Sequence, residues 1–106
     1  MNENVIKAAL LGFGTVGTGV YKVLKNQEKE MSAKIGCKVE IKKILVRNIE
    51  KAAAKIEDAS LLTSQWDEII NDPEIGIVVE TMGGTTPAYE FVKNCLLAGK
   101  HVVTSN

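Results

Sequence analysis

Residues 5–17 read VIKAALLGFGTVG, a short apolar run that leads into a glycine-rich turn. A continuous apolar run closed by glycine is typical of a parallel strand that is buried on both faces. After the turn, apolar residues recur at the spacing of one helix face, at Val16, Val20, Val23 and Leu24. We therefore expect a strand over residues 5–11, a tight turn, and a helix that fades in the polar residues 26–34.

The rest of the chain repeats this alternation of strand and helix. Strands are predicted over residues 39–46, 61–63, 75–79 and 101–104, and in the first of these Val39, Ile41 and Leu45 should share one face. Helices are predicted over residues 50–57, around Trp66 to Ile70, and from Thr86 (the N-cap) and Pro87 to a stop at Gly99. The short connections favour an α/β fold of three layers, in which a doubly wound parallel sheet of about five strands lies between helices.

The first turn contains Gly12, Gly14 and Gly17, a G-x-G-x-x-G pattern between a strand and a helix. In this context the pattern is typical of a Rossmann-type dinucleotide-binding domain. Gly12 permits the sharp turn, Gly14 lacks a Cβ that would block a diphosphate, and Gly17 lets the helix approach the strand. The amides and dipole of the helix start would then hold the negative charge. A turn selected only for tight packing is the alternative, whereas Thr18, in place of a lysine, excludes a P-loop.

The residues after the second strand bear on the choice of cofactor. NAD-preferring domains usually carry an acid there for the ribose hydroxyls, but this chain has Arg47 and Asn48, with Lys51 soon after. Arg47 suits a bidentate contact with a ribose 2′-phosphate, or stacking on adenine. The pattern favours NADP, or use of both NADP and NAD. A solvated pair of surface cations is the alternative for Arg47 and Lys51.

Two further strand ends fall at the same edge of the predicted sheet. Residues 75–79 are followed by Met82, Gly83 and Gly84, and the last strand ends in Thr104, Ser105 and Asn106. Because ligands bind beyond the carboxyl ends of parallel strands, we expect these residues to contact the nicotinamide or a substrate. For the glycine pair, a simple lead into the next helix is the alternative. Glu80, an acid within an apolar strand, is interpreted as a structural residue rather than a ligand contact.

The chain carries 13 basic and 13 acidic side chains, so its formal net charge is zero, which argues against nucleic acid as a partner. The charges are nevertheless segregated. Residues 22–55 hold ten Lys or Arg against four acids, and residues 56–106 hold two Lys against eight acids. Two solvated faces, or a basic site for a phosphorylated ligand, would each account for this distribution.

Leu, Ile, Val and Phe make up 31 of the 106 residues, which is enough for one folded domain over residues 1–106. Cys37 and Cys95 lie far apart and the chain has a single His, so neither a metal site nor a disulfide framework is predicted, and a reducing, cytoplasmic location fits. No apolar run is long enough to span a membrane, and the N-terminus lacks the pattern of a signal peptide.

Four blocks of sequence together resemble the nucleotide-binding domain of homoserine dehydrogenase: residues 9–17 (ALLGFGTVG), 44–47 (ILVR), 79–84 (VETMGG) and 99–106 (GKHVVTSN). The resemblance implies reversible hydride transfer between NAD(P)H and aspartate 4-semialdehyde, which gives homoserine on the route to threonine, methionine and isoleucine. It implies a diphosphate held by Phe13, Gly14, Thr15, Val16 and Gly17, and an adenosine end held by Arg47. It also implies a nicotinamide bordered by Met82, Gly83, Gly84, Thr104, Ser105 and Asn106.

The resemblance places the catalytic residues of the family outside this chain. In the family, a lysine tied to catalysis follows the Thr-Ser-Asn segment directly, and a substrate-binding, dimer-forming region supplies a catalytic Lys and Asp, whereas this sequence ends at Asn106. We therefore expect a piece of a monofunctional, homodimeric enzyme that binds the cofactor and catalyses nothing by itself. The alternatives are the cofactor domain of another NAD(P)-dependent oxidoreductase, such as a semialdehyde or imine reductase, and a free-standing NAD(P)H-sensing module.

Overall fold

The computed structural model describes residues 4–26, 37–82 and 86–104. Within them, one parallel sheet is formed by β1 (Asn4–Leu11), β2 (Cys37–Leu45), β3 (Leu62–Thr63), β4 (Ile75–Glu80) and β5 (His101–Thr104). The strand order is β3-β2-β1-β4-β5, so the chain steps outward from β1 on one side and then returns to β4 on the other. This order confirms the predicted Rossmann-type sheet and puts its switch point between β1 and β4.

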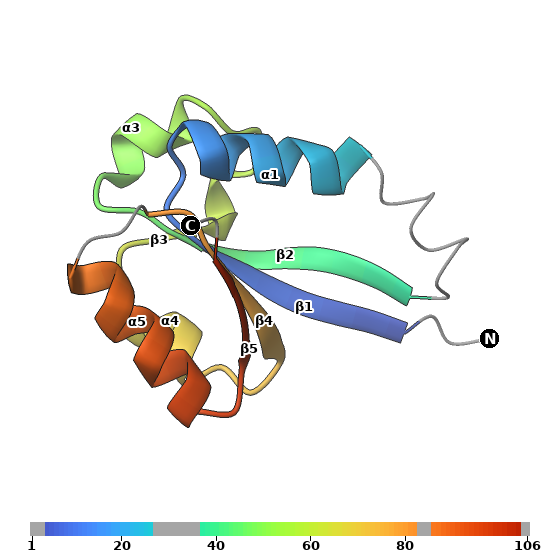
Figure 1. Ribbon diagram of the computed structural model, residues 1–106. Helices are drawn as coiled ribbons and strands as arrows, with labels where there is room; N and C mark the ends of the chain where they lie inside the picture. The colour runs from blue at the N-terminus through green and yellow to red at the C-terminus, as the bar shows by residue number, and fades with distance from the viewer. Residues whose placement is uncertain (1–3, 27–36, 83–85, 105–106) are drawn as a thin grey trace.

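Helices cover both faces of the sheet (Figure 1). On one face lie α1 (Thr15–Asn26) and α3 (Ile49–Ala53), and on the other lie α4 (Asp67–Ile70) and α5 (Thr86–Leu97). A 3-10 turn, η1 (Ala59–Leu61), leads into β3. No helix of the described residues is long and apolar enough to cross a membrane.

Strand β1 supplies the centre of both layers. Ala8 and Leu10 pack beneath α1 and α3, whereas Ala9 and Leu11 pack toward α4 and α5. All four side chains are at most 1% exposed. The predicted burial on both faces is therefore confirmed, and it explains why the run shows no polar alternation.

In β2, the prediction that Leu45 shares a face with Val39 and Ile41 is wrong. Val39 and Ile41 pack on the α1 side as expected, but Leu45 packs on the opposite side of the sheet. The register explains the difference, because Ala8 pairs with Ile41 while the next residue of β1, Ala9, pairs with Lys43. Lys42 is thus an extra residue, a bulge that reverses the alternation of the strand beyond it.

In α1, the buried face differs from the predicted apolar face. The buried side is formed by Gly17 together with the half-buried Val20, Tyr21 and Leu24. Val16 and Val23, which were predicted to share that face, are 51% and 52% exposed. Gly17 packs closely against the Gly12 carbonyl and the Thr81 hydroxyl. Val16, the preceding residue, lies about 100° away around the helix and so points outward.

The predicted element boundaries hold to within a few residues. The largest difference is at α3, which ends at Ala53 rather than at residue 57. The Asp58 carboxylate accepts a hydrogen bond from the Ser60 amide at 3.1 Å and so begins the 3-10 turn that follows. Helix α5 spans Thr86–Leu97, so it begins one residue before the predicted first helical position at Pro87. The predicted stop at Gly99 is confirmed: φ is +82° there, and the amides of Gly99 and Lys100 donate to the carbonyls of Leu96 and Cys95.

Candidate functional site

A pocket of about 950 Å³ opens at the carboxyl ends of β1, β2 and β4, beside the switch point of the sheet. Its walls come from the first turn, from the segment after β2, from the β3–α4 and β4–α5 connections, and from α5. It is lined by Gly12, Phe13, Gly14, Leu45, Val46, Arg47, Asn48, Lys51, Ala52, Lys55, Ser64, Trp66, Thr81, Met82 and Phe91. Segments that are distant in sequence therefore meet where an open α/β sheet binds its ligands.

The three glycines of the turn occupy three different environments. Gly12 has a φ of +102°, which side chains other than glycine rarely adopt, and its amide donates to the Leu45 carbonyl at 2.9 Å. A Cβ on Gly17 would lie 2.4 Å from the Gly12 carbonyl oxygen, which is closer than real contacts allow. A Cβ on Gly14 would meet no described atom within 4 Å. Within the described residues, neither a positive φ nor close packing requires glycine at position 14.

Backbone amides are available at this turn. Within the described residues, the amides of Phe13, Gly14, Thr15 and Val16 have no hydrogen-bond acceptor, as the first turn of a helix requires. Gly14 itself is exposed and lines the pocket. Unpaired amides and the positive end of the α1 dipole together fit a phosphate or diphosphate.

One side of the pocket is basic. Arg47 follows β2, and Lys51 and Lys55 lie further along the chain, in α3 and just beyond it. Asn48 begins α3, since its side-chain oxygen accepts a hydrogen bond from the Lys51 amide at 3.0 Å. Within the described residues, none of the three cations forms an ion pair. By contrast, Lys42 and Lys43 of β2 pair with acids of the second half of the chain.

The other side of the pocket is apolar. The rings of Trp66 and Phe91 lie in contact, with centroids 4.5 Å apart and planes inclined at 37°. Both pack against the core on the α5 side, as does Met82, and all three are half-buried. Trp66 thus both packs on the core and lines the pocket.

The predicted site residues divide into three groups. Gly12, Phe13, Gly14, Arg47 and Met82 meet in the pocket. Thr15, Val16 and Gly17 form the first turn of α1, and Thr104 ends β5 opposite Glu80; none of these four lines the pocket. Gly83, Gly84, Ser105 and Asn106 lie outside the described residues.

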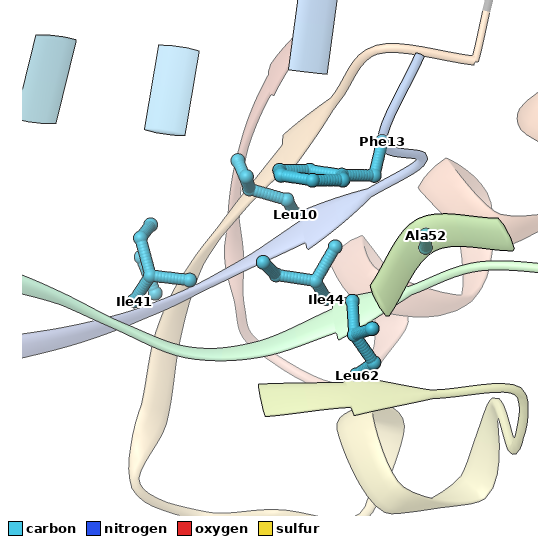
Figure 2. Close-up of a cluster of buried hydrophobic side chains, with 7 residues drawn as sticks. Leu10, Phe13, Ile41, Ile44, Ala52 and Leu62 are labelled. Atoms are coloured by element: carbon cyan, nitrogen blue, oxygen red, sulfur yellow. The ribbon is translucent and has the colours of Figure 1, made fainter. Parts of the chain in front are cut away.

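Phe13 contributes its backbone to the turn, because its side chain belongs to the core. The side chain is 6% exposed and its ring lies over Leu10 of β1 (Figure 2). The ring also meets Tyr21 of α1 edge-on, with centroids 5.8 Å apart. The phenyl ring therefore ties the turn to both β1 and α1.

Among the pocket residues that sequence reasoning did not assign to the site, Lys55, Ser64 and Thr81 carry polar groups. Lys55 is four residues beyond Lys51, a helical spacing that was available as a signal. Thr81 carried no signal, because its role depends on β4 lying beside β1. Glu80 is 2% exposed and accepts the Met82 amide at 2.5 Å, in keeping with the structural role expected of it.

The strand order, the glycine turn and the position of the pocket define a dinucleotide-binding domain. The family model for the NAD-binding domain of homoserine dehydrogenase matches residues 12–106. The chain belongs to this family, for which NAD(P) is the cofactor.

Known proteins agree with this assignment. The homoserine dehydrogenase of Bacillus subtilis is 37% identical over 101 residues, which are 95% of this chain and 23% of that protein. The crystal structure of the Staphylococcus aureus homoserine dehydrogenase at pH 6.0 covers 97% of this chain with a TM-score of 0.89 and 37% identity, and 27% of that chain is matched. The structure of the Thiobacillus denitrificans enzyme covers 97% with a TM-score of 0.89 and 41% identity, matching 24% of its chain. The chain thus spans about a quarter of the length of the relatives it matches.

Proposed function

We propose that this chain holds NAD(P)H in the pocket at the switch point, with the diphosphate on the amides of the glycine turn. The single observation that carries the proposal is the open space beside Gly14, where a Cβ would meet no described atom within 4 Å and a diphosphate can approach the backbone. Beside it lie amides of the helix start without acceptors among the described residues. The diphosphate contacts come from residues 13–17, whose first two members also line the pocket.

The adenosine end lies toward Arg47, with Lys51 and Lys55 beyond it. A ribose 2′-phosphate adds up to about two negative charges, which these three cations stabilise. Within the part of the chain that the structure describes, none of them forms an ion pair. The chain accordingly uses NADP, or both NADP and NAD, with the preference set by the cations.

Titration with NADPH and NADH by calorimetry tests this arrangement. In Arg47→Ala we expect the affinity for NADPH to fall about tenfold more than the affinity for NADH, because a charge-assisted contact is worth roughly 1.5–3 kcal/mol. Lys93→Ala, at an exposed position of α5 away from the pocket, is the matched control. Equal losses for both nucleotides would assign Arg47 to adenine stacking, and no loss would remove it from the site.

The activity of the whole protein is reversible hydride transfer between NAD(P)H and aspartate 4-semialdehyde, as in homoserine dehydrogenase. The nicotinamide is bordered by Met82, Gly83 and Gly84, and by Thr104, Ser105 and Asn106. Substrate binding, catalysis and homodimer formation belong to a further domain, consistent with relatives about four times as long. NAD(P)H supplies the hydride, and these 106 residues bind and orient it. We place the protein in the cytoplasm on the basis of its cysteine usage.

A turnover assay tests whether this chain binds the cofactor without catalysing the reaction. The 106-residue chain, supplied with homoserine and either NADP⁺ or NAD⁺, is expected to bind the nucleotide but to show no increase in absorbance at the wavelength of the reduced nicotinamide. Steady turnover by the purified chain would contradict the proposal.

A further inference from the structure

We infer that Thr81 is a positioning residue for the diphosphate, through the hydrogen bond that its hydroxyl makes to the glycine turn. The inference rests on the proposed function and goes one step further, because it assigns the shape of the turn to a side chain from another strand. Thr81 follows β4 directly and lines the pocket.

The Thr81 hydroxyl lies at the junction of β1, β4 and the turn. Its oxygen is 3.0 Å from the Leu11 carbonyl oxygen and 3.2 Å from the Gly12 carbonyl oxygen. The Thr81 amide also donates to Leu11, at 3.1 Å. The backbone bond continues the pairing of β4 with β1. The single hydroxyl proton is shared between the Leu11 and Gly12 carbonyl oxygens, and its contact with Gly12 is the one that reaches the turn.

The same oxygen borders two of the three glycines. A Cβ on Gly12 would lie 3.2 Å from it, and a Cβ on Gly17 would lie 2.9 Å from it. The turn, the start of α1 and the hydroxyl thus occupy one closely packed volume. Thr81 is half-buried there, so its hydroxyl is partly shielded from competing water.

Peptide geometry links this contact to the ligand. The described peptide bonds are all trans, so the Gly12 carbonyl and the Phe13 amide, which share one plane, point in opposite directions. Holding the Gly12 oxygen at Thr81 therefore fixes the direction of the Phe13 amide, which has no acceptor within the described residues. Without the hydroxyl, this plane can rotate, and the amide loses its alignment for the diphosphate.

Two substitutions isolate the hydroxyl. Thr81→Val keeps the shape and the backbone bond but removes the donor, and Thr81→Ser keeps the donor and removes the methyl group. Affinities for NADPH, NADH, adenosine diphosphate and adenosine are measured by calorimetry or NMR titration, at a temperature where every variant is folded. The free energy of unfolding without ligand is measured in parallel.

In Thr81→Val we expect the affinity for the three diphosphates to fall about three- to tenfold, the range of one hydrogen bond, with adenosine unaffected. Thr81→Ser should stay within about twofold of the wild type. Unchanged diphosphate affinity in Thr81→Val, with or without loss of stability, would make the hydroxyl a purely structural group and reject the inference. If Thr81→Val does not fold, Thr81→Ala removes the same donor, and failure of both to fold would equally reject it. A wild-type chain that binds none of the diphosphates would instead refute the proposed function.

Discussion

At the scale of single residues, the glycine turn separates structural from ligand-related constraints. Gly12 is needed for its φ of +102°, and Gly17 for the close approach of α1 to the turn. Gly14 is needed for neither, since its surroundings are open. The pattern therefore contains two residues that serve the fold and one, Gly14, that we propose serves the ligand, and substitution by alanine distinguishes them.

Gly17→Ala should destabilise the fold. Its Cβ would lie 2.4 Å from the Gly12 carbonyl oxygen and 3.1 Å from the Gly12 carbonyl carbon, so backbone has to move. We expect the free energy of unfolding to fall by about 1–3 kcal/mol, as overpacking does. Chemical denaturation measures this, with Gly19→Ala as the control in the same helix. Gly19 faces open space and should gain about 0.5–1 kcal/mol from the better helix propensity of alanine. Equal effects at the two positions would contradict the account.

Gly14→Ala should have the complementary effect. We expect its free energy of unfolding to stay within about 0.5 kcal/mol of the wild type, as at an unconstrained surface position. Its affinity for NADPH and NADH should fall at least about tenfold, because the added methyl group occupies the place of the diphosphate. Thermal unfolding and calorimetry provide the two readouts. Full affinity in a normally stable Gly14→Ala would show that the ligand does not approach this residue.

At the scale of elements, two lysines bind the α4–β4 connection at the edge of the sheet opposite the pocket. The Lys100 ammonium is buried and donates to the Asp72 and Ile75 carbonyls, both at 2.7 Å. Lys42, the bulge residue of β2, bridges to Asp72 at 2.6 Å and to Glu74 at 2.7 Å. The α4–β4 connection is thereby held from β2 and from β5, on the edge away from the pocket.

The Asp72 carboxylate makes the free energy of unfolding depend on pH. Its hydrogen bond with Lys42 is the largest of the effects that hold the pKa of Asp72 below its ordinary value of about 3.9. A carboxylate with a lowered pKa in the folded state stabilises the fold above its unfolded pKa, and the contribution is lost as the pH falls through the folded pKa. Asp72→Asn should therefore be less stable than the wild type at pH 7, with a difference that shrinks below about pH 4. Urea unfolding from pH 7 to pH 3 measures it, and a constant difference would contradict the assignment.

Local signals predicted most of these elements. The apolar run of residues 5–11 and the stop at Gly99 both act within a few residues, and both are confirmed. The wrong faces arose where a long-range contact overrides the local period: the bulge at Lys42 moved Leu45, and the packing of Gly17 turned Val16 outward. Thr81 had no local signal at all, because its partners lie 69 and 70 residues away in the chain.

At the scale of the whole molecule, the fold brings part of the basic segment into ion pairs with the acidic segment. Lys42 and Lys43 of the basic segment meet Glu68, Asp72 and Glu74 of the acidic one. Arg47, Lys51 and Lys55 stay unpaired within the described residues and line the pocket. This arrangement favours a basic site for a phosphorylated ligand over two solvated faces.

Salt dependence tests the role of this cation group. Between about 50 mM and 500 mM NaCl, the Debye length falls from above 10 Å to below 8 Å, so attraction between exposed charges weakens. We expect the affinity for NADPH to fall several-fold more than that for NADH, since the 2′-phosphate carries the additional charge. Parallel slopes for the two nucleotides would place the 2′-position away from the cations.

The backbone of the glycine turn is the place where we propose that the dinucleotide binds. An NMR titration of the ¹⁵N-labelled chain with NADPH observes the relevant amides one by one. We expect the largest chemical-shift changes at the amides of residues 13–17, with smaller changes at Arg47 and Met82, all saturating at one equivalent per chain. Saturable binding that leaves the amides of residues 13–17 unshifted, or no binding at all, would contradict it.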